Sequence, residues 1–277
     1  SSSHTIGPMT AGRLFVETCS ALPREVLART ARLRVRLFGS LSATGEGHGT
    51  DAAILAGLLG TKPEDCPQGL LQRLASVPDE TYRVELGVGS ALVSLRDIVH
   101  DSIVHEYPYS NTLKAELLDA AGSVLFERVY YSVGGGFVQW EGWKAPEQGE
   151  PVYRYSNMTE LRALIREHGL NIYEIMLANE MAVTGASRPR IIDGLNEILA
   201  RMEDSVRHGL DGSGCLPGPL KVERKAHMLR QRSSALNAAP GKFLASLNAY
   251  AFAASEENAS GGVIVTAPTC GSAGVMP

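Results

Sequence analysis

The sequence predicts an α/β domain with a mixed sheet, followed by a mainly α-helical, truncated domain. Segments with an apolar residue at every second position, typical of half-buried strands, are confined to about the first 150 residues. Segments with helical periodicity dominate the remainder. The Pro/Gly/Glu-rich stretch 146–151 separates the two parts, so we expect domains at 1–150 and 151–277.

The composition is that of a soluble globular protein. Of 277 residues, 44% are apolar and 20% charged, and the net charge of −4 gives no indication of a nucleic acid or an anionic membrane as partner. No apolar run approaches the roughly 18 residues that span a bilayer. The four cysteines contain no C-x-x-C pair, which argues against a zinc finger or disulfide scaffold and favours the cytoplasm.

The predicted elements of the first part alternate between helix and strand. A helix from about 9 to 21 carries apolar residues at helical spacing and stops at Pro23. Leu33–Phe38 alternates in period two and predicts a strand, and a helix follows from about 52 to 59. Four further strands are expected at 81–87, 110–118, 123–132 and 138–140, with a tight turn at 121–122 joining an antiparallel pair.

The second part is predicted to be helical. Helices are expected at 159–168, 172–183, 188–209 and 240–258, with Ser156 or Asn157 as the first N-cap. The basic segment Leu220–Arg232 is either the solvated face of a helix or an anion-binding surface. In the second case, Lys221 or Arg224 would assist with charge.

The stretch Thr44–Asp51, TGEGHGTD, places a single histidine, His48, between glycines. Glycine accepts positive φ and lets the backbone approach a ligand, and histidine exchanges protons near neutral pH. A strand precedes the stretch and a helix follows, with Thr50 or Asp51 as N-cap, so the loop would lie at a helix N-terminus that favours anions. The alternative is a plain connection with a solvent-exposed histidine.

Two small-residue segments at the ends of the chain are further candidates. Ser1–Met9 is dense in hydroxyls around His4, and these hydroxyls either bind a carboxylate or cap the following helix. Near the other end, Cys270 lies in a Gly/Ser/Thr turn, which favours a metal or cluster ligand over a buried structural thiol.

Several motifs, in order along the whole chain, resemble the iron-sulfur-dependent L-serine dehydratases, also called L-serine ammonia-lyases. They are SSSHTIGPMTAG (1–12), GSLSATGEGHGTD (39–51), YYSVGGGF (130–137), LPGPLKVER (216–224), EENASGG (256–262) and VTAPTCGSAGVMP (265–277). The resemblance implies a β domain similar to a regulatory small-molecule-binding module and the N-terminal part of a helical α domain. We expect a fragment that lacks the first strand of the β domain and the later part of the α domain.

The activity that the resemblance implies is conversion of L-serine to pyruvate and ammonia without pyridoxal phosphate. It implies a 4Fe-4S cluster held by three cysteines, with one iron open to substrate, and a cytoplasmic homodimer. Elimination of water needs a base for the α-proton and an acid or Lewis acid for the hydroxyl. We interpret His48 as the base and His4 as a positioning or second proton-transfer residue. The hydroxyls expected to bind the substrate carboxylate are those of Ser2, Ser3, Thr5 and Thr50.

The cluster turn departs from the family pattern. The family reads A-P-T-N-G-A-C-G, whereas Ala273 occupies the expected cysteine position here and Cys270 stands three residues earlier. The other cluster cysteines of the family lie beyond Pro277, so we expect the fragment alone to be inactive. Two alternatives stay open: a non-catalytic amino-acid-binding regulatory module, or a lyase for another β-substituted amino acid.

Overall fold

The structure is a computed structural model that describes residues 2–217, 220–235 and 239–266. The chain forms two compact units, one of Ser1–Trp143 with Met202–Pro277 and one of Lys144–Arg201, and each is described by itself. Cys270 and Ala273 lie outside the described residues.

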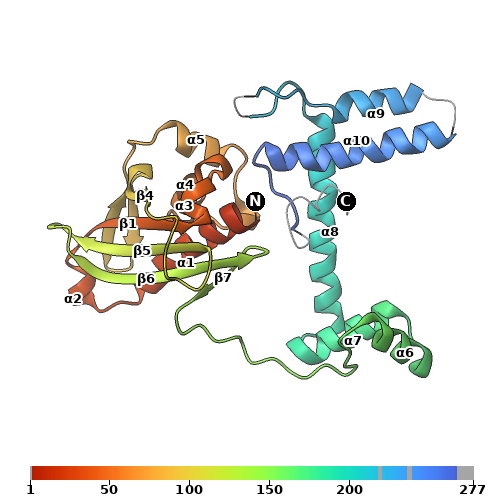
Figure 1. The fold of residues 1–277 in the computed structure, drawn as a ribbon, viewed down its shortest axis with the longest axis horizontal. Helices are drawn as coiled ribbons and strands as arrows, with labels where there is room; N and C mark the ends of the chain where they lie inside the picture. The colour runs from red at the N-terminus through yellow and green to blue at the C-terminus, as the bar shows by residue number, and fades with distance from the viewer. Residues whose placement is uncertain (1, 218–219, 236–238, 267–277) are drawn as a thin grey trace. The chain divides into compact units, whose positions relative to one another are not determined.

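The described elements confirm a mixed sheet in the N-terminal part and helices in the C-terminal part (Figure 1). The strands are β1 (Thr30–Gly39), β2 (Tyr82–Leu86), β3 (Gly89–Val93), β4 (Ile98–His100), β5 (Asn111–Asp119), β6 (Val124–Gly134) and β7 (Phe137–Trp140). The helices are α1 (Gly7–Ser20), α2 (Arg24–Leu27), α3 (Ser40–Thr44), α4 (Thr50–Leu58), α5 (Leu70–Ser76), α6 (Met158–His168), α7 (Ile172–Thr184), α8 (Arg188–Asp211), α9 (Ala226–Ala235) and α10 (Ala239–Ala259).

The strand order of the sheet is β2-β3-β1-β5-β6-β7, so β1 lies in its interior. β5 pairs antiparallel along the whole of β1, whereas β3 and β4 pair parallel with successive parts of its other edge. Because β1 and β4 run in the same direction, their C-terminal ends meet at one edge of the sheet, with Leu37 opposite His100. The segment that carries His48 begins at this edge.

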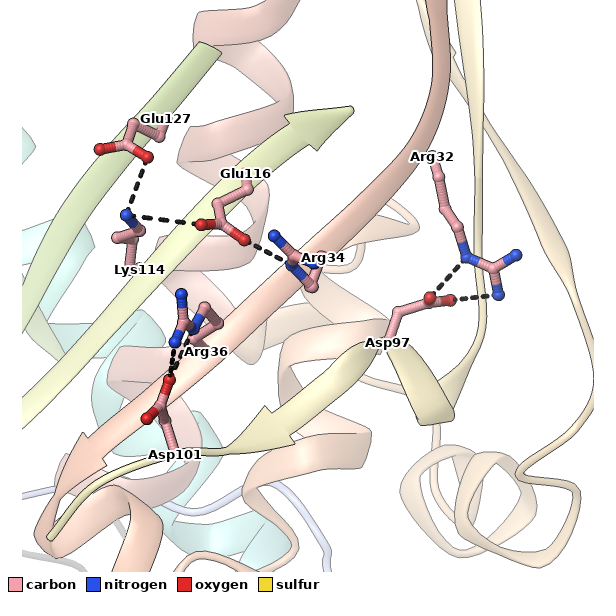
Figure 2. Close-up of polar contacts among 8 residues, drawn as sticks. All are labelled: Arg32, Arg34, Arg36, Asp97, Asp101, Lys114, Glu116 and Glu127. Atoms are coloured by element: carbon pink, nitrogen blue, oxygen red, sulfur yellow. Dashed lines mark hydrogen bonds and ion pairs between the residues drawn. The ribbon is translucent and has the colours of Figure 1, made fainter. Parts of the chain in front are cut away.

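The two faces of β1 carry different side chains over residues 32–37. Leu33, Val35 and Leu37 point into the core under α1 and α4, and burying each such side chain contributes about 1.5–3 kcal/mol. The alternate residues Arg32, Arg34 and Arg36 form ion pairs on the opposite face, as Figure 2 shows. Their acidic partners are Asp97, Glu116 and Asp101, and Lys114 also contacts Glu116 and Glu127.

Helices α1 and α4 pack with their backbones in close approach. A Cβ atom on Gly57 would overlap the Met9 carbonyl oxygen, and one on Gly12 would lie 2.7 Å from the Ile54 carbonyl oxygen. All residues of α4 except Asp51 are buried, as expected for a helix that is apolar on every side. This rigid pair fixes the start of α4, where the candidate loop ends.

The predicted helices and strands of the first part agree with the structure, including the turn at Gly122, whose φ is 82°. One detail is wrong: neither Thr50 nor Asp51 caps α4. The N-cap is Gly49, with φ 65°, and Thr50 is the first helical residue. The strands β3 and β4 were not anticipated, and neither were the short helices α2, α3 and α5.

The C-terminal helices agree with the predicted segments. Asn157 caps α6 by accepting hydrogen bonds from the backbone N–H groups of Thr159 and Glu160. The basic segment is helical only from Ala226, where α9 begins. No helix among the described residues is both long and apolar enough to cross a membrane.

Candidate functional site

The candidate site lies where β1 ends and the chain turns through α3 into α4. A π-helical turn, Ser2–Ile6 (η1), precedes α1 and packs against α4 and β6. The segment Glu46–His48 (η2) is a 3₁₀ turn between α3 and α4. The Ser-Ser-His-Thr and Gly-His-Gly-Thr motifs therefore meet in space, although their histidines are 44 residues apart in the sequence.

His4 and His48 are in direct ring contact. Their ring centroids are 4.8 Å apart and the planes are tilted by 35°. His4 is half-buried, whereas the side chain of His48 is exposed to solvent in this structure. The two imidazoles expected to take part in catalysis thus form one pair.

The tautomer of His48 is fixed by the backbone. Its Nδ1 lies 2.8 Å from the carbonyl oxygen of Thr44, and because a carbonyl oxygen only accepts, Nδ1 must carry the proton. In the neutral imidazole the lone pair is then on Nε2. His48 is therefore arranged to accept a proton at Nε2.

His4 is held between two hydroxyls. Its Nδ1 is 2.9 Å from Ser3 Oγ and its Nε2 is 3.0 Å from Ser40 Oγ. Burial, and then the proximity of His48, lower the pKa of His4 below its ordinary value, although an interaction with Ser40 opposes the shift. His4 is consequently neutral near pH 7, with one ring nitrogen donating and the other accepting.

Two reciprocal hydrogen bonds tie the histidine-bearing segments together. Thr5 Oγ1 donates to the carbonyl oxygen of His48 at 3.0 Å, and the buried Thr50 Oγ1 donates to the carbonyl oxygen of His4 at 2.5 Å. No side chain caps α1, so the capping interpretation of the N-terminal hydroxyls is wrong. In this structure the hydroxyls of Thr5 and Thr50 donate their protons to backbone carbonyl oxygens. Binding of the substrate carboxylate by Ser2, Ser3, Thr5 and Thr50 stays a prediction.

Glycine is required at two turns around the pair. Gly49 has φ 65° and Gly39, between β1 and α3, has φ 59°, a region that side-chain-bearing residues rarely adopt. Of the three glycines beside His48, only Gly49 has a positive φ. The expected freedom of the loop is thus limited to its junction with α4.

Sequence comparisons match this chain over both parts. A family model described as serine dehydratase beta chain matches residues 1–143, more than half of the chain. The chain belongs to the serine dehydratase family. A second family model, serine dehydratase alpha chain, matches residues 167–277.

Curated relatives agree with the family assignment. The chain is similar to an L-serine dehydratase of Haemophilus influenzae (34% identity over 286 residues), one of Streptomyces coelicolor (38% over 293) and L-serine dehydratase 1 of Escherichia coli K12 (33% over 288). Each comparison covers 100% of this chain and 62% of the relative. The chain thus spans somewhat less than two thirds of the length of these serine dehydratases.

The structure brings further residues close to the histidine pair that sequence reasoning did not single out. Ser40 reaches His4, and His100 lies beside the His48 loop. Two buried polar atoms, Ser132 Oγ and Asn111 Oδ1, have no hydrogen-bond partner among the described residues. Ser132 Oγ lies directly against Gly7, next to η1. Ser40 and Ser132 had a signal in the sequence, because they are part of the motifs GSLSATGEGHGTD and YYSVGGGF.

The cluster implied by the family finds no ligand set in the described part of the chain. No group of three or more His, Cys, Asp or Glu residues there is arranged to hold a metal ion. Cys19 is buried in α1, where burial raises the pKa of its thiol to about 12, Cys66 is half-buried, and Cys215 is exposed. Arg224 donates to Ser260 Oγ.

Proposed function

We propose that the full-length protein is an L-serine dehydratase that eliminates water from L-serine and yields pyruvate and ammonia. The observation that carries the proposal is the His4–His48 pair, with the Nε2 lone pair of His48 set by the Thr44 carbonyl. Family membership supports the substrate, because the relatives are named L-serine dehydratases. The proposal includes independence from pyridoxal phosphate.

In this proposal His48 Nε2 takes the α-proton of serine, and the protonated His48 returns a proton, directly or through His4, to the β-hydroxyl, which leaves as water. The resulting enamine tautomerises to an imine, which water hydrolyses to pyruvate and ammonia. A positioned base contributes typically 10²- to 10⁴-fold to such a step. The family resemblance assigns a 4Fe-4S cluster to this enzyme class, but the described residues do not fit one, so no step is derived through it.

His4 supports His48 in two ways under this proposal. Its lowered pKa keeps it neutral, so that a proton on His48 does not meet a second positive charge across 4.8 Å. Its ring nitrogens and the hydroxyls of Ser3 and Ser40 form a chain that positions substrate or carries a second proton. Ser2 and the unpaired Ser132 Oγ, both buried at η1, would add hydroxyls toward a carboxylate.

The test is His48→Ala in the full-length protein, prepared without oxygen and assayed for pyruvate from L-serine. We expect kcat/KM to fall by at least about 10²-fold, as for a lost general base. His168→Ala is the control, because that histidine packs against Tyr153 in the other unit. Turnover near that of the wild type in His48→Ala would refute the role of His48. Binding of L-serine without turnover by the wild type would favour a regulatory module.

A further inference from the structure

His100, the last residue of β4, lies beside the His48 loop without belonging to it. Its Nδ1 is 3.0 Å from the carbonyl oxygen of Ser42 in α3. Its Nε2 is 3.0 and 3.1 Å from the two carboxylate oxygens of Asp51 in the first turn of α4. The imidazole therefore bridges the helix before His48 and the helix after it.

The partners of His100 determine its protonation. A carbonyl oxygen and an ionised carboxylate only accept hydrogen bonds, so both contacts are satisfied when both ring nitrogens donate, which is the imidazolium form of the ring. Burial lowers the pKa of His100. The hydrogen bonds to Asp51 and the Ser42 carbonyl, with the charges of Asp51 and Glu46, outweigh burial, and the pKa is raised overall.

The neighbouring elements contain few other charges that bear on this ring. η2 carries Glu46 and His48, and α3 contains no titratable side chain. β1 carries Arg36, whose guanidinium is paired with Asp101. The side chains of His100 and Asp51 are 32% and 22% exposed, so water screens the pair only in part.

We propose that His100 is a positioning residue for His48: as an imidazolium it ties α3 to α4 and holds the segment between them. Two ends of a loop joined through one side chain lose conformational freedom. Misplacing a catalytic group by about 1 Å can cost 10²-fold in rate. The inference rests on the proposed function, because the tie matters for catalysis only if His48 is the base.

The stabilisation that His100 provides by joining α3 to α4 decreases as the pH rises. The pKa of His100 is raised in the folded protein, so its contribution is complete below the ordinary histidine value of about 6.5. It is lost as the pH rises through the raised folded pKa, where the ring loses one donor and its charge. The segment 44–50 is thus held most firmly on the acidic side of that pKa.

The first measurement is amide hydrogen exchange in the full-length protein, expressed as protection factors at His48 and Gly49. Both amides donate within this segment, to the carbonyl oxygens of Gly45 and Glu46. We expect His100→Gln to lower these factors about 5- to 10-fold, with β5 unchanged, in keeping with the loss of a charge-assisted hydrogen bond that is partly exposed. In Asp51→Asn the loss of protection should occur at lower pH than in the wild type, since the pKa of His100 returns toward its ordinary value.

The matched control is His105→Gln. His105 is half-buried five residues further on, but its Nδ1 accepts a hydrogen bond from the backbone N–H of Tyr107 and it does not bridge α3 and α4. This variant should leave the protection of His48 and Gly49 unchanged. Equal effects of the two histidine substitutions would overturn the proposal.

Kinetics separate this proposal from the proposed function. His100→Gln should lower kcat for L-serine about 10-fold and leave KM within about twofold, because the base is displaced while substrate contacts remain. Unchanged protection in His100→Gln, or lost protection with normal kcat, would overturn the positioning role. Normal turnover in His48→Ala would instead refute the catalytic assignment of His48, whatever the exchange data show.

Discussion

The hydroxyl of Thr50 has one proton, and the structure directs it to the carbonyl oxygen of His4. Thr50 is fully buried, so its hydroxyl does not reach water. A buried acceptor that loses its partner costs about 1–3 kcal/mol. We expect Thr50→Val, which keeps the shape of the side chain, to lower the free energy of unfolding by this amount in urea denaturation.

Thr50→Ser is the matched control, since it keeps the hydroxyl and removes only a methyl group. It should retain most of the stability that Thr50→Val loses. If valine and serine were equally destabilising, the methyl group rather than the hydrogen bond would be the stabilising feature.

Sequence reasoning found the residues of the histidine pair but not all that surrounds them. His4 and His48 stand in conspicuous Ser/Thr- and Gly-rich motifs, which is why they could be singled out. His100 has no such surroundings in the sequence. Its role depends on parallel pairing of β4 with β1, which brings residue 100 to residues 42 and 51.

At the scale of elements, periodicity predicted the longer helices and strands well. β3 and β4 were not predicted, because they are only five and three residues long and lack a sustained alternation of apolar and polar residues bounded by turn signals. The N-cap of α4 was misassigned for a different reason. Thr50 is a good capping residue, but its hydroxyl is used by the His4 backbone, and Gly49 supplies the required left-handed turn.

The contact between α1 and α4 depends on glycine. A methyl group on Gly57 would overlap the backbone of Met9, and neither helix can yield without disturbing the core. We expect Gly57→Ala to destabilise the first unit by about 1–3 kcal/mol, the usual cost of overpacking, measured by thermal unfolding.

Gly194→Ala provides the control for this prediction. Gly194 lies within α8, and a Cβ atom there meets nothing within 4 Å. Alanine should therefore stabilise that helix by up to about 1 kcal/mol through its higher helix propensity. A Gly57→Ala protein as stable as the wild type would show that α1 and α4 are able to separate.

At the scale of the whole molecule, the described part of the chain contains the paired histidines but no set of side chains that could hold a cluster. A 4Fe-4S cluster is held by cysteine thiolates that converge on one site. The buried thiol of Cys19, with its pKa raised to about 12, stays protonated at neutral pH, and Cys215 lies on the surface. Of the four cysteines, only Cys270 stands in the turn that resembles the family's cluster motif.

We therefore expect Cys270→Ser in the full-length protein to lose iron and visible absorbance after anaerobic reconstitution, together with pyruvate formation. Cys215→Ser is the matched control and should keep both, because its thiol is exposed and lies outside that turn. The 277-residue chain by itself should hold no stable cluster, since one thiolate is too few. Four irons on that chain would contradict this account of the ligands. An intact, active cluster in Cys270→Ser would mean that Cys270 is not a ligand, although Ala273 stands at the family's cysteine position.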